Sequence, residues 1–341
     1  MTATQGEQAI CHVLADVGGT NARFAWVTND DASLRCVESF ACAEYKQFEE
    51  AVKAYFDRLS AQGAPKAVSA CFAIAASVHD DLICMTNSPW QFSRRALADA
   101  LGIPVAVLND FSAQAWCLSG LLPGQVKPVQ SGGAAVADAP EAHYTRTVVG
   151  PGTGFGGASL LPAGIVVESE PGHVSFGPVT EHELALLKQL WQRIPRVSVE
   201  HLLSGPGLAN LYWANACLLG EARELAAPAI VAGALAGDAL CEQTVRDFVG
   251  ILGSVCGDIA LSMGSLSGFY LSGAILEKMD RLFDTSLFCA RFNDKGPFSE
   301  WCRQVPVARI TAPYPGLLGC AAYSRTHYST IHSRSHHGSL A

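Results

Sequence analysis

Five residues that could bind a metal ion and a phosphate stand together at the end of the first apolar run. The stretch "LADVGGTNARFAWV" places Asp16, Gly18, Gly19, Thr20 and Asn21 at one predicted strand–turn–strand corner. A carboxylate at the end of a strand can hold hydrated Mg²⁺, and the hydroxyl and amide groups suit phosphate oxygens. Glycine has no Cβ, so its backbone N–H groups can surround an anion. The corner therefore suggests one half of a phosphate-and-magnesium site.

A second glycine corner occurs later, where Gly152, Thr153 and Gly154 stand between two strand-like runs. A structural explanation is open at each corner, because glycine closes hairpins wherever a turn needs positive φ. Repetition in the same context favours phosphate binding. The spacing Gly152-x-Gly154-x-x-Gly157 also fits the dinucleotide fingerprint, but that fingerprint needs a helix next, and "ASLLPAG" follows. A P-loop is excluded because the chain contains neither Gly-Lys-Ser nor Gly-Lys-Thr.

The elements that must position the first corner form a predicted α/β unit. Strands are expected at residues 10–17, 22–28, 34–41 and 66–76. The apolar residues from Tyr45 to Leu59 recur at helical spacing. "LICMTN" predicts a short strand, "FSRRALADALG" a helix closed by its last glycine, and "IPVAVLND" a buried strand.

The second part repeats this beginning. "TRTVVGPGTGFGGASLLPAGIVVESE" predicts a strand, a glycine corner, a returning strand and a third strand. Helices are expected from Glu181 to about Met263, with a capping box at Thr180-x-x-Glu183. "GFYLSGAILEKM" predicts a strand, a glycine corner and a helix, and "VPVARI" predicts the last strand. A final helix is expected to begin near Gly316.

A chain of 341 residues suggests two domains of ordinary size. We expect a small α/β domain over residues 1–110, completed by a C-terminal helix at about 313–326. A large α/β domain is expected over residues 111–312. Residues 327–341 are polar and lack periodicity, which predicts a disordered tail.

The composition argues against several classes of protein. The residues are 49% apolar and 16% charged, which allows a substantial core. A formal charge of −8 argues against nucleic-acid or acidic-membrane partners. No apolar run reaches the ~18 residues of a membrane span, and no signal peptide is expected. The 12 cysteines are scattered without a C-x-x-C pair, which indicates reduced, mostly buried thiols in a cytoplasmic protein and argues against zinc.

Five motifs in order resemble those of a known family. "DVGGTNAR", "LNDF", "GPGTGFG", "EPGH" and "LSGPGLANLY" closely resemble the bacterial glucokinases, over about residues 12–323. The zinc-binding cysteine cluster of the repressor-and-kinase sugar family is missing, so the resemblance is to the zinc-free branch. It implies the actin-like ATPase (ribonuclease H-like) fold, with two α/β domains and a cleft between them. It also implies ATP-dependent phosphorylation of glucose at the 6-hydroxyl, the entry step of glycolysis.

A sugar kinase needs a base beside the attacking hydroxyl and an electrostatic clamp on the phosphoryl group. Asp110 is the candidate base, because it lies just past a buried strand, at the carboxyl end where α/β proteins bind ligands. In the resembled family this aspartate accepts the proton of the 6-hydroxyl, and Asn109 binds neighbouring hydroxyls. The structural alternative is an Asn-Asp turn that caps a helix starting at Phe111.

Glu170 and His173, three residues apart, can contact adjacent hydroxyls of one pyranose. The family usually has Glu-Gly-Gly-His, whereas this chain has Pro171 after the glutamate. Proline lacks an N–H and is expected to hold Glu170 in extended geometry. A sugar contact through that N–H is therefore in question, while the side-chain contacts need not be.

Two further positions rest on the resemblance. Glu200, in "RVSVEHLLSG", resembles the last sugar-binding carboxylate of the family. Alternatively, it is an acidic residue in the first turn of a helix capped by Ser198. Gly273, in "LSGAILE", resembles the adenosine-binding turn, where a missing side chain lets a base lie close to the backbone.

The sequence thus predicts a cytoplasmic glucokinase that uses ATP and Mg²⁺, with Asp16 holding the ion through water. The expected partners are glucose and ATP, with no nucleic acid and no membrane. The family is often dimeric, which makes a homodimer an implication of the resemblance. A non-catalytic sugar sensor, a kinase for another hexose and an actin-like assembly ATPase remain alternatives. The phosphoryl donor and the tolerance for mannose or glucosamine are left open.

Overall fold

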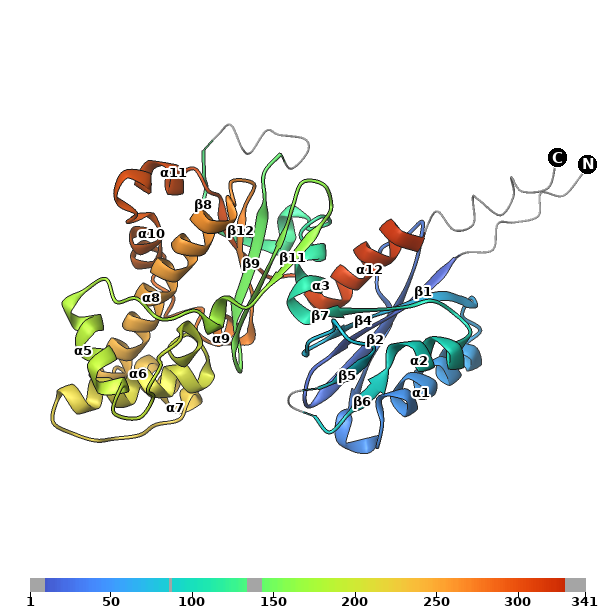
Figure 1. Cartoon of the computed structure of the whole chain (residues 1–341), viewed down its shortest axis with the longest axis horizontal. Helices are drawn as coiled ribbons and strands as arrows, with labels where there is room; N and C mark the ends of the chain where they lie inside the picture. Colours follow the sequence, from blue (N-terminus) through green and yellow to red (C-terminus); the bar gives the residue numbers. More distant parts are fainter. Residues whose placement is uncertain (1–9, 86–87, 134–142, 329–341) are drawn as a thin grey trace, which may run out of the picture. The chain divides into compact units, whose positions relative to one another are not determined.

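The computed structural model describes residues 10–85, 88–133 and 143–328. Its contacts separate into two compact units (Figure 1). Unit 1 contains the described residues up to Leu122 and those from Ala312 onward. Unit 2 contains the described residues from Pro123 to Thr311. Each unit is built around its own mixed sheet.

The sheet of unit 1 has five strands in the order β3-β2-β1-β4-β7. They are β1 (Cys11–Val17), β2 (Asn21–Thr28), β3 (Arg35–Ala41), β4 (Ala67–Ile74) and β7 (Val105–Asn109). The first three form an antiparallel meander, and β4 and β7 run parallel to β1. A separate hairpin consists of β5 (Leu82–Cys84) and β6 (Gln91–Ser93).

Helices cover both faces of this sheet. They are α1 (Phe48–Ala61), α2 (Arg94–Leu101), α3 (Asp110–Cys117) and α12 (Pro315–Tyr328), with a 3-10 turn η1 (Cys42–Glu44). In unit 1, α1 and α2 lie on one face and α12 on the other (Figure 1). Strand side chains alternate between faces, so Val13 and Ala15 join the core under α1, and Leu14 joins the core under α12. Asp16 therefore also faces α12.

His12 is fully buried on the face of β1 that lies under α12. Its Nε2 lies 2.6 Å from Asn29 Oδ1, and its Nδ1 lies 2.8 Å from Ser69 Oγ. Because a carbonyl oxygen only accepts, Nε2 donates to Asn29, and the neutral ring accepts from Ser69 through Nδ1. Burial lowers the pKa of His12 from 6.5, and the nearby charge of Arg325 lowers it further, against the bond to Asn29.

We expect this histidine to make unit 1 sensitive to mild acid. The unfolded chain binds the proton more tightly than the folded chain, so the free energy of unfolding should fall as pH decreases from 6.5 through the lower folded pKa. Thermal unfolding of wild type and His12→Asn between about pH 5 and 8 tests this. The stability advantage of wild type should shrink as the pH falls. A difference independent of pH would contradict the assignment.

The sheet of unit 2 has six strands in the order β11-β10-β9-β12-β13-β8. They are β8 (Val126–Gln130), β9 (Arg146–Pro151), β10 (Phe155–Leu160), β11 (Val166–Ser169), β12 (Phe269–Leu271) and β13 (Val307–Ile310). Strands β9, β10 and β11 form an antiparallel meander, β12 and β13 run parallel to β9, and β8 is antiparallel to β13.

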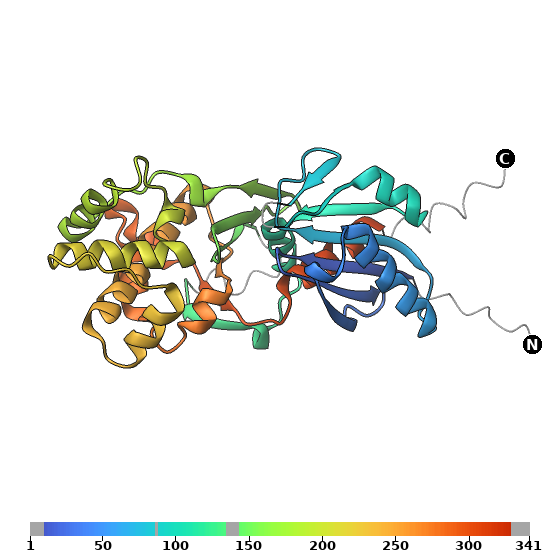
Figure 2. The ribbon, with the colours of Figure 1, turned by 90° about the horizontal axis from the view of Figure 1, so that it is seen from below.

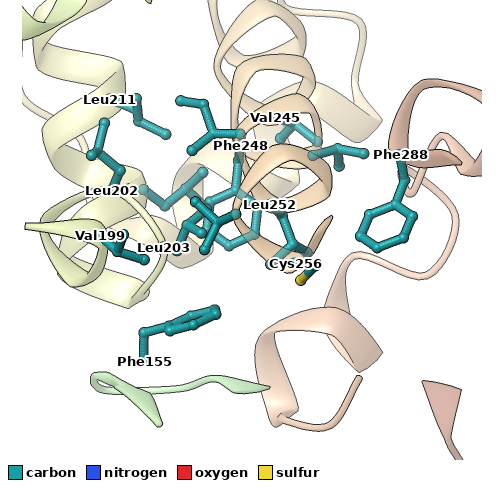
Figure 3. Packing of buried hydrophobic residues seen from close by; sticks show 14 of the residues in the cluster. Phe155, Val199, Leu202, Leu203, Leu211, Val245, Phe248, Leu252, Cys256 and Phe288 are labelled. Carbon is teal, nitrogen blue, oxygen red and sulfur yellow. The ribbon is translucent and has the colours of Figure 1, made fainter. Parts of the chain in front are cut away.

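Most helices of unit 2 gather on one side of its sheet (Figure 1, Figure 2). The described helices of unit 2 are α5 (Glu181–Leu190), α6 (Gly205–Leu218), α7 (Ala227–Leu235), α8 (Ala239–Met263), α9 (Ala274–Lys278), α10 (Thr285–Asn293) and α11 (Ser299–Arg303). The 3-10 turns are η2 (Pro123–Gln125), η3 (Pro171–His173), η4 (Val199–His201) and η5 (Gly296–Phe298). The ring of Phe155, at the start of β10, lies against this helical core beside Val199 and Leu203 (Figure 3).

The predicted repeat of strand, corner, strand and strand is confirmed by the two antiparallel meanders. The expected helix from Phe92 starts later, because Phe92 and Ser93 belong to β6 and Ser93 Oγ caps α2. The capping box at α5 is half right. Thr180 Oγ accepts from the Glu183 N–H, but the Glu183 carboxylate accepts from the Val179 N–H and pairs with Arg291.

The contacts assign more of the chain to unit 1 than the expected boundary at residue 110 allows. The reason is that α3 packs on α12: the Trp116 and Tyr323 rings meet edge-on, and a Cβ on Gly319 would collide with the Ala113 carbonyl. Helix α12 runs over Pro315–Tyr328, later than the expected 313–326, so residues 327 and 328 are helical. The rest of the expected tail, 329–341, lies outside the described residues.

All cysteines lie in the described part of the chain, where they are free and mostly buried, as expected. None of the described helices combines the length and apolar character that crossing a membrane requires.

Candidate active site

The first glycine corner joins β1 to β2. The Gly18 N–H donates to the Asn21 carbonyl over 3.0 Å, and the Cys42 N–H of η1 donates to the Thr20 carbonyl over 2.9 Å. These bonds fix the turn backbone, while the Thr20 side chain is exposed. Gly18 does not have a left-handed φ. Positive φ therefore does not explain the glycine at this position. Open space beside the backbone is the remaining explanation.

Asp16 is the penultimate residue of β1 and lies opposite Arg23 of β2 in the ladder. Its part-buried carboxylate faces the first turn of α12, at Gly316. Burial raises the pKa of Asp16, and the positive charge of Arg23 opposes that rise. A single carboxylate in this position fits Mg²⁺, which keeps several waters and takes one or two carboxylates from a protein.

Asn109 and Asp110 lie where β7 passes into α3. Asn109 is the N-cap: its Oδ1 accepts from the N–H groups of Phe111 (2.9 Å) and Ser112 (3.3 Å), and its amide donates to the Ala76 carbonyl. The capping explanation is thus confirmed for Asn109. Asp110 is the first residue of α3, with a part-buried side chain in a turn that favours negative charge. Asp110 Oδ1 also accepts from the Phe111 N–H over 3.0 Å, so this carboxylate helps to hold the start of α3 and is also the candidate for chemistry.

The second corner joins β9 to β10. The Gly152 N–H donates to the Gly154 carbonyl over 2.8 Å, and neither glycine has a left-handed φ. The Gly205 N–H, at the start of α6, donates to the Gly152 carbonyl over 2.8 Å. Gly273 has a φ of 117°, and a Cβ there would lie 2.5 Å from the Pro151 carbonyl oxygen. The structure thus brings Gly273 and the start of α6 to this corner.

Glu200 also reaches the second corner. Its Oε2 accepts from the Phe155 N–H over 2.8 Å, and a Cβ on Gly154 would collide with the same carboxylate. Glu200 lies in the turn η4 that begins after Ser198, as the structural alternative predicted. Its carboxylate nevertheless bonds to a distant strand. Position in a first turn therefore does not account for the direction of this side chain.

The turn η3, which carries His173, packs on the same strand. A Cβ on Gly172 would collide with the Phe155 carbonyl, and a Cβ on Gly157 would lie 2.9 Å from Pro171. Residues 174–176 pair with residues 197–199 through two backbone bonds of 3.0 Å each. The exposed side chains of Glu170 and His173 are thereby held in the neighbourhood of Glu200.

One detail of this turn differs from expectation. Glu170 has φ −116° and ψ 64°, so Pro171 does not hold it extended. The reason is that the Glu170 carbonyl turns to accept the His173 N–H over 3.1 Å. Sequence reasoning also missed Arg196, whose Nη2 donates to the His173 carbonyl over 2.9 Å. No local signal marks that residue, because the contact joins distant segments.

Comparison with known proteins agrees with this architecture. The model of the glucokinase family matches residues 13–327. The glucokinase of Chromohalobacter salexigens is 40% identical over 312 residues, which cover 90% of this chain and 95% of that protein. The crystal structure of a glucokinase from an Antarctic psychrotroph superposes with a TM-score of 0.84 at 35% identity, covering 92% of this chain and 98% of that one. A ROK family glucokinase from Streptomyces griseus, solved with glucose and AMPPNP, has a TM-score of 0.62 at 17% identity. The match covers 93% of this chain and 99% of that one.

Two mixed sheets, each containing an antiparallel meander with a glycine corner, define the actin-like ATPase fold of the sugar kinases. This confirms the predicted fold class. The chain belongs to the glucokinase family and is therefore an enzyme that phosphorylates glucose.

Proposed function

We propose that the enzyme transfers the terminal phosphoryl group of ATP to the 6-hydroxyl of glucose, with Mg²⁺. The observation that supports this most strongly is the bond from the Phe155 N–H to the Glu200 carboxylate. It joins a candidate sugar residue to the backbone of a candidate phosphate corner. A structural relative, the Streptomyces griseus glucokinase, was solved with glucose and AMPPNP, an ATP analogue.

Three side chains of unit 2 are proposed to bind the sugar. Glu170 and Glu200 would accept hydrogen bonds from its hydroxyls, and the His173 imidazole can donate or accept. The turn geometry supports this set, because Pro171 and Gly172 pack on β10 and leave the side chains on either side exposed.

From unit 1, Asp110 is proposed as the general base. Its carboxylate would take the proton of the 6-hydroxyl as that oxygen attacks the phosphoryl group. Asn109 can offer to the sugar only the amide N–H that does not bond to Ala76, because its carbonyl oxygen caps α3. Its proposed contribution to binding is therefore smaller.

The two glycine corners are proposed to hold the nucleotide. Backbone N–H groups beside Gly18, Gly19 and Thr20, and beside Gly152, Thr153 and Gly154, would face phosphate oxygens. The side chains of Thr20, Asn21 and Thr153 can add hydrogen bonds, and Gly273 would leave room for adenosine. Mg²⁺, when bound, neutralises charge on the phosphates. Asp16 would hold it through water.

An assay of ADP release with ATP, Mg²⁺ and a panel of hexoses tests the proposed reaction. Glucose should be the preferred substrate, and 6-deoxyglucose should bind without releasing ADP, because it lacks the accepting hydroxyl. Phosphorus NMR should identify the product as glucose 6-phosphate. Transfer to 6-deoxyglucose, or a product phosphorylated elsewhere, would refute the assignment.

We predict that His173→Ala weakens discrimination between glucose and 1,5-anhydroglucitol, which lacks the anomeric hydroxyl. A site built to bond a hydroxyl rejects the analogue without it, because the protein group is left unpaired. The measurement is the ratio of kcat/KM for the two sugars in wild type and variant. An unchanged ratio would remove His173 from the sugar site.

A further inference from the structure

The first turn of α12 lies against the carboxylate of Asp16. A Cβ on Gly316 would lie 2.8 Å from Asp16 Cγ and 3.0 Å from each carboxylate oxygen. Real Cβ atoms essentially never show a contact of 2.8 Å, and 3.0 Å is tighter than most of their contacts, so either the helix or the carboxylate would have to move. The contact joins residues near opposite ends of the chain within unit 1.

The backbone itself does not require glycine at this position. Gly316 has no left-handed φ, and it is the second residue of a regular helix, where alanine is the better helix former. Gly319, one turn later, is different, because its missing Cβ allows α12 to approach the backbone of α3 at Ala113. The three heavy atoms that would lie nearest to a Cβ on Gly316 all belong to Asp16.

The start of α12 is held firmly in this place. Leu317, Cys320 and Ala321 are buried against the sheet, and the close approach at Gly319 fixes the helix against α3. Tyr314, just before the helix, has a φ of 57°, which is strained for a residue other than glycine. Its ring lies 5.9 Å from the guanidinium of Arg23, the ladder partner of Asp16. A clash at Gly316 is therefore relieved by the short carboxylate side chain rather than by the helix.

We propose that Gly316 is a positioning residue for Asp16, and that its missing side chain lets the carboxylate take the orientation needed to hold the magnesium ion of the nucleotide complex. This inference rests on the proposed function, which gives Asp16 that role. Gly316 itself touches neither substrate nor metal. Gly316 acts only by determining where the Asp16 carboxylate lies.

Calorimetric titration with ADP, in the presence of Mg²⁺ and in its absence with EDTA, tests the proposal. Gly316→Ala should weaken binding of MgADP by ~10–100-fold, the range for residues that orient a metal ligand. Binding of metal-free ADP and of glucose should change less than twofold. Gly120→Ala is the matched control, since a Cβ there meets nothing within 4 Å, and it should behave as wild type. A Gly316→Ala variant that binds MgADP as tightly as wild type overturns the proposal.

Asp16→Asn separates this inference from the proposed function. If Asp16→Asn keeps the full Mg²⁺ dependence of ADP binding, the metal role of Asp16 fails, and the proposal fails with it. If Asp16→Asn loses that dependence and Gly316→Ala retains it, only the inference about Gly316 fails.

A stability cycle covers the case in which Gly316→Ala folds poorly. In an Asp16→Ala background the carboxylate is gone, so adding Gly316→Ala should lower the melting temperature no further. The same loss in both backgrounds would show that another contact requires glycine, and would overturn the proposal.

Discussion

Asp110→Asn is expected to bind glucose within severalfold of wild type and to turn over ~10²–10⁴ times more slowly, the range for loss of a general base. The amide has nearly the shape of the carboxylate, so α3 should still begin at this residue, with Asn109 as its cap. An amide cannot take the proton of the attacking hydroxyl. The effect should therefore appear in kcat and leave the KM for glucose nearly unchanged.

The matched control is Asp99→Asn, which removes the same charge from an exposed position of α2 in unit 1. It should keep wild-type turnover. Steady-state kinetics and a melting curve for both variants complete the comparison. Near-wild-type turnover of a folded Asp110→Asn enzyme would show that the base lies elsewhere.

The second large effect is expected at Gly154. A Cβ there would collide with the Glu200 carboxylate, which is the mobile end of a long side chain and would swing away from the Phe155 N–H. The fold should survive, while the proposed sugar contact is lost. Because a hydrogen bond to a charged group is worth about 1.5–3 kcal/mol, we expect Gly154→Ala to raise the KM for glucose about 10–100-fold.

Gly152→Ala is the informative comparison, because a Cβ on Gly152 meets no protein atom within 4 Å. Under the proposed function it points into space for the nucleotide, so the KM for ATP should rise while that for glucose stays near wild type. Kinetics with each substrate varied in turn separate the two effects. Identical kinetic profiles for the two alanine variants would contradict the proposal that Gly154 affects the sugar site and Gly152 the nucleotide site.

The architecture could be predicted because local signals carry it. Glycine corners between apolar runs predicted both meanders, and alternation along β1 follows from a period of two. The extent of unit 1 could not be predicted from the sequence, because α3 packs on α12 through a contact between Gly319 and Ala113, which are distant in sequence. Strand β8 was missed because "VKPVQ" is short and contains proline.

The candidate site divides in the same way. Motif order indicated the family, and the comparisons confirm it, while the residue roles stay predictions. The sequence left the glycine corners open between a turn that needs positive φ and ligand binding. Both corners close antiparallel hairpins, but Gly18, Gly152 and Gly154 have no left-handed φ, so positive φ does not explain these glycines. The contact of Glu200 with Phe155 spans 45 residues, and that of Gly316 with Asp16 spans most of the chain, so no local pattern could reveal either.

The most direct test is a crystal structure of the enzyme with glucose, Mg²⁺ and a non-hydrolysable ATP analogue. We expect the Asp110 carboxylate within about 2.6–3.2 Å of the 6-hydroxyl oxygen, the reach of a general base. We also expect Glu170, His173 and Glu200 to contact the other hydroxyls, and the phosphates to lie against the N–H groups of both glycine corners. A glucose molecule bound without Asp110 at its 6-hydroxyl, or phosphates bound away from the corners, would contradict the proposed function.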